Sequence, residues 1–513
     1  MKLNTKRTIL VGFAFFLICT FWQAYDSIIP LILTNKFGMS QTWSGVIMAI
    51  DNILALFMLP LFGALSDKSK SRHGRRTPFI VAGTIVAVAA FISLSFVDAA
   101  QLQKIDAVAA IDDTAALETI YNSDAAKVEL NTPEGDTFVL TEAMSKEDFL
   151  AIRMQLPDGT TNPEYTNFVV PARQAYTAQV TERDPSSLIL FIALLLIVLV
   201  AMATFRSPAV ALMPDVTVKP LRSKANAIIN LMGTAGGIVV LVLGMVFSTT
   251  AIRNAMMTYT VFFGVVGGIM LAALAVFLLT VREPKWAAEM QEASIRLGIE
   301  EKEEVADEKR GLSKNEKWSL LFLLASIVLW FFGYNAITSK YSVYAANVLD
   351  KDYNFTMIIA QAAAVVAYVP VGLVASRIGR KKTIMAGVVM LAVAFGAASF
   401  IRSDSPMLLI NALFALAGIA WATINVNSFP MVVEMCSGAD VGKYTGFYYT
   451  ASMAAQTLTP MVSGYLMDEL GMTVLFPYGT IFVALAFVTM ALVRHGDSKI
   501  IAKKGLEAFD NDD

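Results

Sequence analysis

The sequence predicts an all-α membrane protein in which twelve transmembrane helices form two six-helix halves, with a small exterior insertion domain. Of its 513 residues, 56% are hydrophobic and 16% are charged, whereas soluble proteins carry about 25% charged residues. Apolar stretches of about 19–26 residues recur along the whole chain, and a helix of that length crosses ~30 Å of hydrocarbon. The alternating segments of about ten residues that build membrane barrels are absent.

The expected spans fall into two groups of six. The first group is 8–33, 43–66, 78–97, 187–212, 226–248 and 257–281. The second group is 319–340, 355–376, 383–401, 407–432, 446–467 and 472–493. We therefore divide the chain into 1–97 (helices 1–3), 98–184 (exterior insertion), 185–281 (helices 4–6), 282–317 (linker), 318–494 (helices 7–12) and 495–513 (tail).

Lysine and arginine gather in loops on one face of this arrangement. The loops "DKSKSRHGRRTP" (67–78) and "SRIGRKKT" (376–383) lie on the same face as both ends of the chain. Cytoplasmic loops carry an excess of these residues. We therefore expect a multi-pass protein of the plasma membrane (the cell inner membrane), with both termini cytoplasmic.

Two longer polar segments interrupt the spans. Residues 282–317 hold eight basic and ten acidic side chains, which indicates a solvated cytoplasmic linker with partial helix. Residues 98–184 hold six basic and sixteen acidic side chains on the exterior. Within them, "KVELNTPEGDTFVLT" (127–141) predicts a hairpin, so we expect a small folded domain that contains β-structure. A lid or a partner-binding surface is our hypothesis for its role.

Several function classes are excluded by what the chain lacks. Cys19 and Cys436 lie far apart without metal-ligand spacing, and both histidines fall outside the apolar spans. No phosphate-binding loop of the ATP-driven type is present. We therefore expect no metal, no cofactor, no nucleic-acid partner and no enzyme activity.

Two carboxylates stand inside apolar spans. A charged side chain at the bilayer centre costs roughly 2.5–3.5 kcal/mol, so it usually faces a cavity or a partner. Asp26 in span one and Asp51 in span two should lie at a similar depth, about 10–13 Å below the exterior surface. Two such groups would not both ionise easily, so they predict a cation-coupling site that holds H⁺ or, alternatively, Na⁺ through oxygen ligands.

The surroundings of Asp26 indicate a substrate cavity. In "FWQAYDSIIP" (21–30), helical spacing puts Trp22 and Asp26 on one face, with Gln23 and Tyr25 beside them. An aromatic ring against a sugar face, with polar groups on the hydroxyls, is a common way to hold a carbohydrate. The alternative is a structural hydrogen bond to another helix, with the aromatic residues as interfacial anchors. The second half should supply the opposite wall through Tyr334, Asn335, Gln361, Trp421, Asn425 and Gln456, although polar amides in spans often only join helices, at ~0.6 kcal/mol each.

One motif repeats at the same place in both halves: "GRRT" (74–77) and "GRKKT" (379–383), each at the cytoplasmic exit of the second span. With Gly63 and Asp67, the first copy resembles the major facilitator superfamily. More narrowly, "SDKSKSRHGRRTPFI" (66–80) is similar to its sucrose-transporter branch, close to the glycoside–pentoside–hexuronide:cation symporters. This likeness implies the major facilitator fold and also supports Asp26, because animal relatives of the branch carry a carboxylate in the first helix.

The basic loop also predicts a cytoplasmic gate. Asp67 can pair with Arg75 and Arg76, and Asp215 lies at the inner end of span four with Arg206, Lys219 and Arg222 nearby. The alternative is that the arginines only enforce topology. The cation sites of plant and sodium-linked relatives do not transfer, because their aspartates correspond here to Leu199, Leu59 and Ala55.

These observations favour a monomeric secondary transporter in the lipid bilayer, one that takes up a small molecule, a disaccharide or glycoside, with protons by alternating access. One alternative is proton-coupled efflux of an amphipathic compound. Another is a membrane-anchored sensor that uses the exterior domain.

Overall fold

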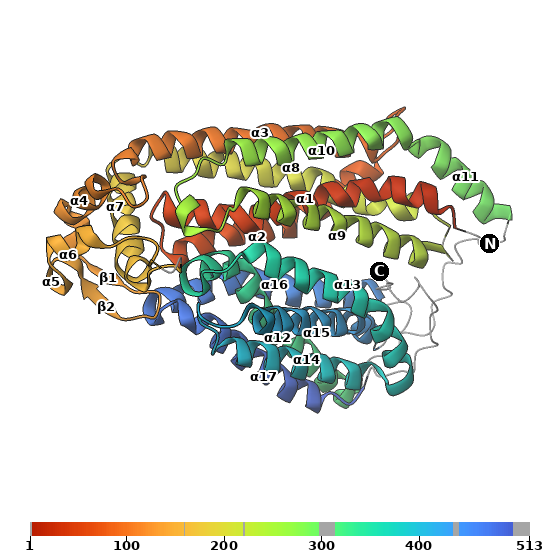
Figure 1. Ribbon diagram of the computed structural model, residues 1–513. Helices are drawn as coiled ribbons and strands as arrows, with labels where there is room; N and C mark the ends of the chain where they lie inside the picture. Colours follow the sequence, from red (N-terminus) through yellow and green to blue (C-terminus); the bar gives the residue numbers. More distant parts are fainter. Residues whose placement is uncertain are drawn as a thin grey trace.

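A computed structural model describes residues 3–157, 160–218, 221–296, 313–433, 435 and 441–495. Each of the twelve predicted spans coincides with a long helix, which confirms the all-α membrane fold in two halves (Figure 1). The first half consists of α1 (Thr5–Asn35), α2 (Gln41–Asp67), α3 (Thr77–Lys104), α8 (Ser186–Val216), α9 (Arg222–Phe247) and α10 (Thr260–Thr280). The second consists of α12 (Lys314–Tyr344), α13 (Tyr353–Ile378), α14 (Arg380–Ala398), α15 (Met407–Val433), α16 (Val441–Leu470) and α17 (Leu475–Leu492).

Within the described ranges, ten helices are by themselves long and apolar enough to cross a membrane. Of the twelve helices, α13 and α16 are not among them, although α13 contributes a shorter apolar stretch, Tyr353–Tyr368. Both are flanked by the rest of their half, so the bundle can shield their polar positions from lipid.

Each half is built around its own core. In the first half, buried aromatic side chains of α1, α3, α8 and α10 pack together, among them Phe21, Phe91, Phe205 and Phe263. In the second half, Trp330, Phe395 and Phe476 belong to an equivalent cluster from α12, α14 and α17. Because close-packed interiors deform little, each half can move as a unit.

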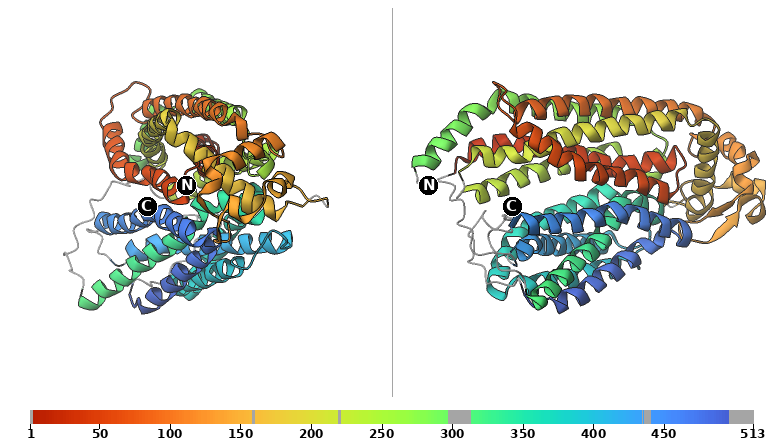
Figure 2. Two further views of the ribbon diagram at one scale, coloured as in Figure 1. Left: turned by 90° about the vertical axis from the view of Figure 1, so that its left-hand side faces the viewer. Right: turned by 180° about the vertical axis from the view of Figure 1, so that it is seen from behind.

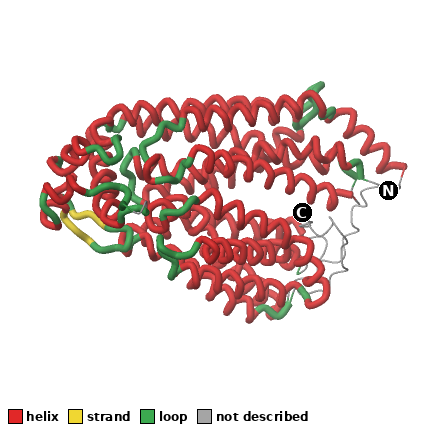
Figure 3. The backbone as a smooth tube through the Cα atoms, in the orientation of Figure 1, coloured by secondary structure: helices red, strands yellow, loops and turns green. Residues whose placement is uncertain are grey.

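The insertion is a folded, mainly helical domain at one end of the bundle (Figures 1 and 3). Its α-helices and strands are α4 (Thr114–Asn122), β1 (Glu129–Asn131), β2 (Thr137–Val139), α5 (Leu140–Ala143), α6 (Lys146–Ala151) and α7 (Val170–Arg183). Short helical turns connect them at η1 (Asp106–Val108), η2 (Asp124–Lys127) and η3 (Tyr165–Val169). The hairpin expected over 127–141 is present, with Leu130 opposite Phe138, while the rest of the domain is helical.

The remaining connections are short. The 3₁₀ turns η5 (Ile252–Asn254) and η8 (Met472–Val474) precede α10 and α17, and the π-helical turn η6 (Ala345–Leu349) extends α12. The expected linker begins with α11 (Glu283–Arg296), which agrees with partial helix there. Residues 297–312 and the tail 496–513 lie outside the described residues.

The bundle has two distinct ends. We call the end that carries the insertion the insertion end, and the opposite end, where α1 begins and α17 finishes, the termini end (Figure 2). The halves are joined closely at the insertion end. There α2 and α16 approach so closely that a Cβ on Gly45 would lie 2.0 Å from the carbonyl oxygen of Pro460, and a Cβ on Gly464 would lie 2.2 Å from that of Gln41. The described conformation is therefore closed at the insertion end.

A buried ion pair fixes the first half at this end. Lys36 follows α1 and donates to both carboxylate oxygens of Asp98 in α3, at 2.6 and 2.7 Å, and neither side chain is exposed. The ammonium also donates to the carbonyl oxygen of Met257 at 2.7 Å and lies 4.7 Å from the ring centre of Tyr259. These contacts replace the water that the two charges lose, so the pair ties α1, α3 and the α9–α10 loop together.

We predict that Asp98→Asn lowers the unfolding free energy by about 3–5 kcal/mol, because it leaves the Lys36 ammonium buried without its counter-charge. Thermal denaturation of the detergent-purified protein measures the change. The double change Lys36→Met with Asp98→Leu should regain much of the loss, since it removes both charges. As a control, Lys104→Met breaks the partly exposed pair with Asp184 and should leave the melting temperature unchanged. Equal shifts for Asp98→Asn and Lys104→Met would contradict this account.

Candidate functional site

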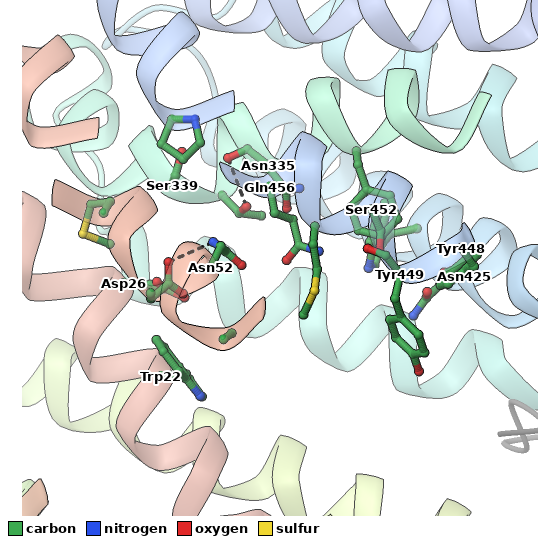
Figure 4. A pocket seen from close by; sticks show the side chains of 18 of the residues that line it. Trp22, Asp26, Asn52, Asn335, Ser339, Asn425, Tyr448, Tyr449, Ser452 and Gln456 are labelled. Atoms are coloured by element: carbon green, nitrogen blue, oxygen red, sulfur yellow. Dashed lines mark hydrogen bonds between the residues drawn. The ribbon is translucent and has the colours of Figure 1, made fainter. Parts of the chain in front are cut away.

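A cavity of about 470 Å³ lies between the two halves (Figure 4). Six helices line it, three from each half. Its lining consists of Trp22 and Asp26 from α1; Met48, Asp51, Asn52 and Ala55 from α2; Arg206 from α8; Phe331, Asn335, Thr338 and Ser339 from α12; Trp421, Asn425 and Phe429 from α15; and Tyr448, Tyr449, Ser452, Met453, Gln456 and Pro460 from α16.

The two carboxylates predicted from the sequence meet in this cavity. Asp26 of α1 and Asp51 of α2 both line it. Asn52 donates to Asp51 at 2.8 Å, and Figure 4 shows Asn52 and Asp26 directed toward the same space. Neither carboxylate faces lipid, which accounts for their presence in apolar helices.

Trp22 stands one helical turn before Asp26, on the same face of α1. Its ring packs edge-on against Phe21 and Tyr25, at centroid distances of 5.2 and 5.4 Å. These contacts hold the indole at the cavity wall, so a flat apolar face lies beside a carboxylate.

Arg206 corrects one sequence interpretation. We expected it beside Asp215 at the end of α8, but it lines the cavity, and its guanidinium carbon lies 5.6 Å from the centre of the Trp22 ring. The reason is that α8 continues to Val216, so nine residues separate Arg206 from Asp215, or about 13 Å along the helix. The cavity therefore contains one cation and two carboxylates.

The second half supplies amides, hydroxyls and rings. Four of the predicted residues line the cavity: Asn335, Trp421, Asn425 and Gln456. On α16 the sequence analysis identified Gln456 but missed Tyr448 and Ser452, although the three residues recur at intervals of four, the spacing of one helical face. That periodicity was a readable signal for a polar wall.

Two predicted glutamines lie outside the lining and join the halves instead. Gln361 of α13 donates to the side-chain oxygen of Gln23 at 2.8 Å, and Gln23 donates to the hydroxyl of Tyr353 at 3.2 Å. Because the amides satisfy each other, they form a hydrogen-bonded bridge between α1 and α13.

Two predicted tyrosines also lie outside the lining, directly behind it. Tyr25 is buried against Phe21 and Trp22. Tyr334 stacks on Trp421 with ring centroids 3.6 Å apart and planes within 4°. Each tyrosine therefore packs against a tryptophan that borders the cavity, because the helix geometry directs the two tyrosine rings into their own half.

The predicted gate residues form a network at the termini end of the first half. The Arg76 guanidinium donates to Asp215 at 2.8 Å and to Asp67 at 2.5 Å, and it is only 5% exposed. Arg75 donates to both oxygens of Asp215, at 2.5 and 3.1 Å. The hydrogen bond to Asp215 raises the pKa of Arg75, which keeps it charged. The side chain of Arg222, the fifth predicted member, lies outside the part that the structure describes.

A carboxylate that sequence reasoning did not single out completes this network. Glu283, at the start of α11, accepts from the backbone N–H groups of Arg76 and Thr77 at 2.9 and 2.8 Å. It thereby caps the beginning of α3, where unpaired N–H groups favour a negative charge. The beginning of the linker is thus held by the first half.

Comparisons with known proteins agree with this architecture. Residues 6–109, 174–367 and 351–508 match the sequence pattern of the Major Facilitator Superfamily. The inward-open conformation of the xylose transporter XylE from E. coli is similar over 99% of both chains, with a TM-score of 0.59 and 14% identity. The nucleoside transporter NupG is similar over 96% of this chain and 100% of its own, with a TM-score of 0.50 and 16% identity.

Matches to curated sequences are short. The sucrose transport protein SUC4 of Arabidopsis thaliana is 42% identical over 51 residues, 10% of each chain. YagG of Escherichia coli (strain K12), named for glycoside/cation symport, is 33% identical over 64 residues, 12% of this chain and 14% of its own. These matches therefore cover only a small part of either relative.

The family pattern covers most of the chain, and the helices carry it as two halves around a polar cavity. The protein is thus a multi-pass membrane transporter of a small molecule and not an enzyme. It belongs to the Major Facilitator Superfamily.

Proposed function

We propose that the protein moves a disaccharide or a related glycoside through the central cavity by alternating access, with H⁺ as the driving ion. The observation that carries this proposal is the lining of the cavity, which combines indole rings, amides, hydroxyls and two carboxylates. Its volume of about 470 Å³ falls within the range of small-molecule sites, roughly 300–1,000 Å³.

The lining suits a polyhydroxylated solute. The rings of Trp22 and Trp421 offer flat apolar faces from opposite halves, as the C–H face of a pyranose requires. Asn335, Asn425 and Gln456 can both donate to hydroxyls and accept from them. Because the two walls belong to different halves, a bound solute contacts both and responds to their relative movement.

The names of the two short sequence matches support the same solute class. One refers to sucrose transport and the other to glycoside/cation symport.

The charges in the cavity give a reason why solute movement would be coupled to H⁺. With Asp26, Asp51 and Arg206 all ionised, the cavity carries one net negative charge, and a single proton neutralises it. Closing the halves over an uncompensated charge is costly, whereas closing over a neutral, loaded cavity is not. Na⁺ held by the same carboxylate oxygens is the alternative coupling ion.

We further propose that the termini end faces the cytoplasm of a plasma-membrane protein and that the transporter acts as a monomer. The two basic loops, around 67–78 and 376–383, follow α2 and α13 at that end. The conformation closed at the insertion end is then the inward-facing one.

We predict that Asp26→Asn abolishes proton-driven accumulation of labelled sucrose in liposomes while solute exchange without a gradient persists. A membrane potential of 100 mV is worth ~2.3 kcal/mol per charge, or about 50-fold accumulation. The variant should fall to equal concentrations on both sides, since the proton site is lost but the polar walls remain.

Asp106→Asn, an exposed carboxylate of the insertion, serves as the matched control and should accumulate sucrose normally. Undiminished accumulation by Asp26→Asn would refute its role. Accumulation that follows a Na⁺ gradient alone would replace H⁺ as the coupling ion, and movement of solute against the proton flow would favour export.

The ion network at the termini end predicts an order of effects. Asp215→Asn removes the negative charge that Arg75 and Arg76 share and leaves the buried Arg76 with a single carboxylate. Asp67 is 57% exposed and binds one arginine, so Asp67→Asn should do less harm. We expect sucrose uptake to fall about tenfold or more for Asp215→Asn, because charged hydrogen bonds are worth about 1.5–3 kcal/mol. Initial uptake rates, normalised to protein in the membrane, test this order, and a larger loss for Asp67→Asn would reverse it.

A further inference from the structure

We propose that the β1–β2 hairpin of the insertion is a clasp between the two halves. It belongs to the first half, grips the loop between α16 and α17 of the second half, and holds the insertion end closed. For that end to open, the hairpin must release the loop between α16 and α17. Figures 1 and 2 show the hairpin beside the insertion-end termini of these two helices.

The insertion is anchored firmly to the first half. Its core includes Ile252 and Met256, from the loop between α9 and α10. Gln101 of α3 donates to the Thr181 hydroxyl at 3.1 Å, and Gln174 donates to the side-chain oxygen of Asn35 at 3.1 Å. The hairpin therefore moves with the first half.

The hairpin reaches the second half through its turn. Asn131 donates from its side chain to the carbonyl oxygen of Asp468 at 2.8 Å. The N–H of Met472 donates to the carbonyl oxygen of Pro133, also at 2.8 Å. A second point of contact lies outside the hairpin, where the Thr161 hydroxyl donates to the Asp350 carboxylate.

Two glycines make this approach possible. Gly135 has φ +103° and Gly471 has φ +85°, both in the left-handed region. A Cβ on Gly135 would lie 2.6 Å from the carbonyl oxygen of Leu470, and one on Gly471 would lie 2.5 Å from the N atom of Gly135. The two backbones thus touch at positions where a side chain on either would separate them.

The clasp and the contact between α2 and α16 share one residue, Asp468. The carboxylate of Asp468, whose carbonyl oxygen binds the hairpin, accepts from the backbone N–H groups of Gln41 and Thr42 at 2.8 and 2.7 Å. It supplies, from the second half, an N-terminal cap for α2. The carbonyl oxygen of Gln41 also accepts from the buried ammonium of Lys340 at 2.5 Å. Hairpin, α2 and α16 are consequently fastened at one point.

The interface between the hairpin and the second half borders a cavity. This second cavity of about 470 Å³ lies beneath the hairpin, bordered by the insertion and both halves. Its lining mixes apolar side chains, among them Val128, Met467 and Met472, with polar ones, among them Glu129, Asn131, Gln174, Gln41, Asn347 and Asp468. Water can replace the few hydrogen bonds that cross the interface. Such a contact is strong enough to bias the conformation and weak enough to break in each cycle.

The test measures how often the insertion end opens, without any solute, so it stands or falls separately from the proposed function. In a background with Cys19→Ser and Cys436→Ser, Ser44→Cys places a thiol in α2 at the closed end, where Ser44 is fully buried. The rate of its alkylation by a membrane-impermeant maleimide reports opening. Asn131→Ala should raise this rate about three- to tenfold, the value of one hydrogen bond.

Thr137→Ala is the matched control, because Thr137 pairs with Asn131 across the hairpin on the opposite strand. It should leave the alkylation rate unchanged. Gly471→Val should raise the rate by an independent route, since its side chain would push the two backbones apart. Rates equal to the control in both clasp variants would overturn the proposal.

A reversible cross-link tests whether fixing the same contact keeps the insertion end closed. Pro133→Cys with Met472→Cys places thiols on adjacent backbones of the two halves, and oxidation should suppress alkylation of Ser44→Cys until a reductant is added. Glu129→Cys with Val139→Cys joins the hairpin only to itself, at a paired register position, and should not suppress it. A clasp pair that fails to cross-link while the control pair does, or one that cross-links without slowing alkylation, would contradict the proposal.

Discussion

The organising constraint of this molecule is that charged side chains inside a membrane bundle need water or a partner. Asp26, Asp51 and Arg206 meet that need by bordering one cavity between the halves. Lys36 and Asp98 meet it by pairing in a sealed interior. The same requirement is thus met in two different ways. A charge that faces a cavity can exchange protons or contact solute as the halves move, whereas a charge that is sealed with its partner can only hold helices together.

The two separate cores determine which contacts can change when the halves move. Since each half packs around its own buried aromatic cluster, the contacts between halves can change while those within a half persist. The described contacts follow that division. Arg76, Asp67 and Asp215 bind within the first half at the termini end, whereas Asp468 and Lys340 bind across the halves at the insertion end. The hydrogen bond between Gln23 and Gln361 also joins the two halves, through α1 and α13.

The sequence predicted what depends on local pattern. Span lengths identified twelve helices, and isolated carboxylates in apolar runs identified Asp26 and Asp51. The motif in the basic loop identified Arg76 as a partner of Asp67, but it did not identify Arg75 and Arg76 as the partners of Asp215. Arg206 was misplaced because the end of α8, which a composition pattern locates poorly, decides its depth. Tyr334 and Gln361 were expected at the cavity, but whether a polar group faces a cavity or a neighbouring side chain depends on helix rotation. Asn131 and Asp468 could not be paired at all, since 337 residues separate them and both stand in ordinary polar surroundings.

The insertion adds a feature that the twelve helices do not require. A transporter built from two rigid halves needs its closed ends to be stable enough to exclude leakage yet easily reversed. Gly45 and Gly464 provide tight packing between α2 and α16, and such packing alone offers little to adjust. The hairpin is anchored in one half and hydrogen-bonded to the other. Substitutions of its polar residues, which lie outside the membrane, can therefore shift the equilibrium between the closed and the open insertion end without changing the cavity. Selection could therefore alter how long the transporter dwells in each conformation without altering what it binds.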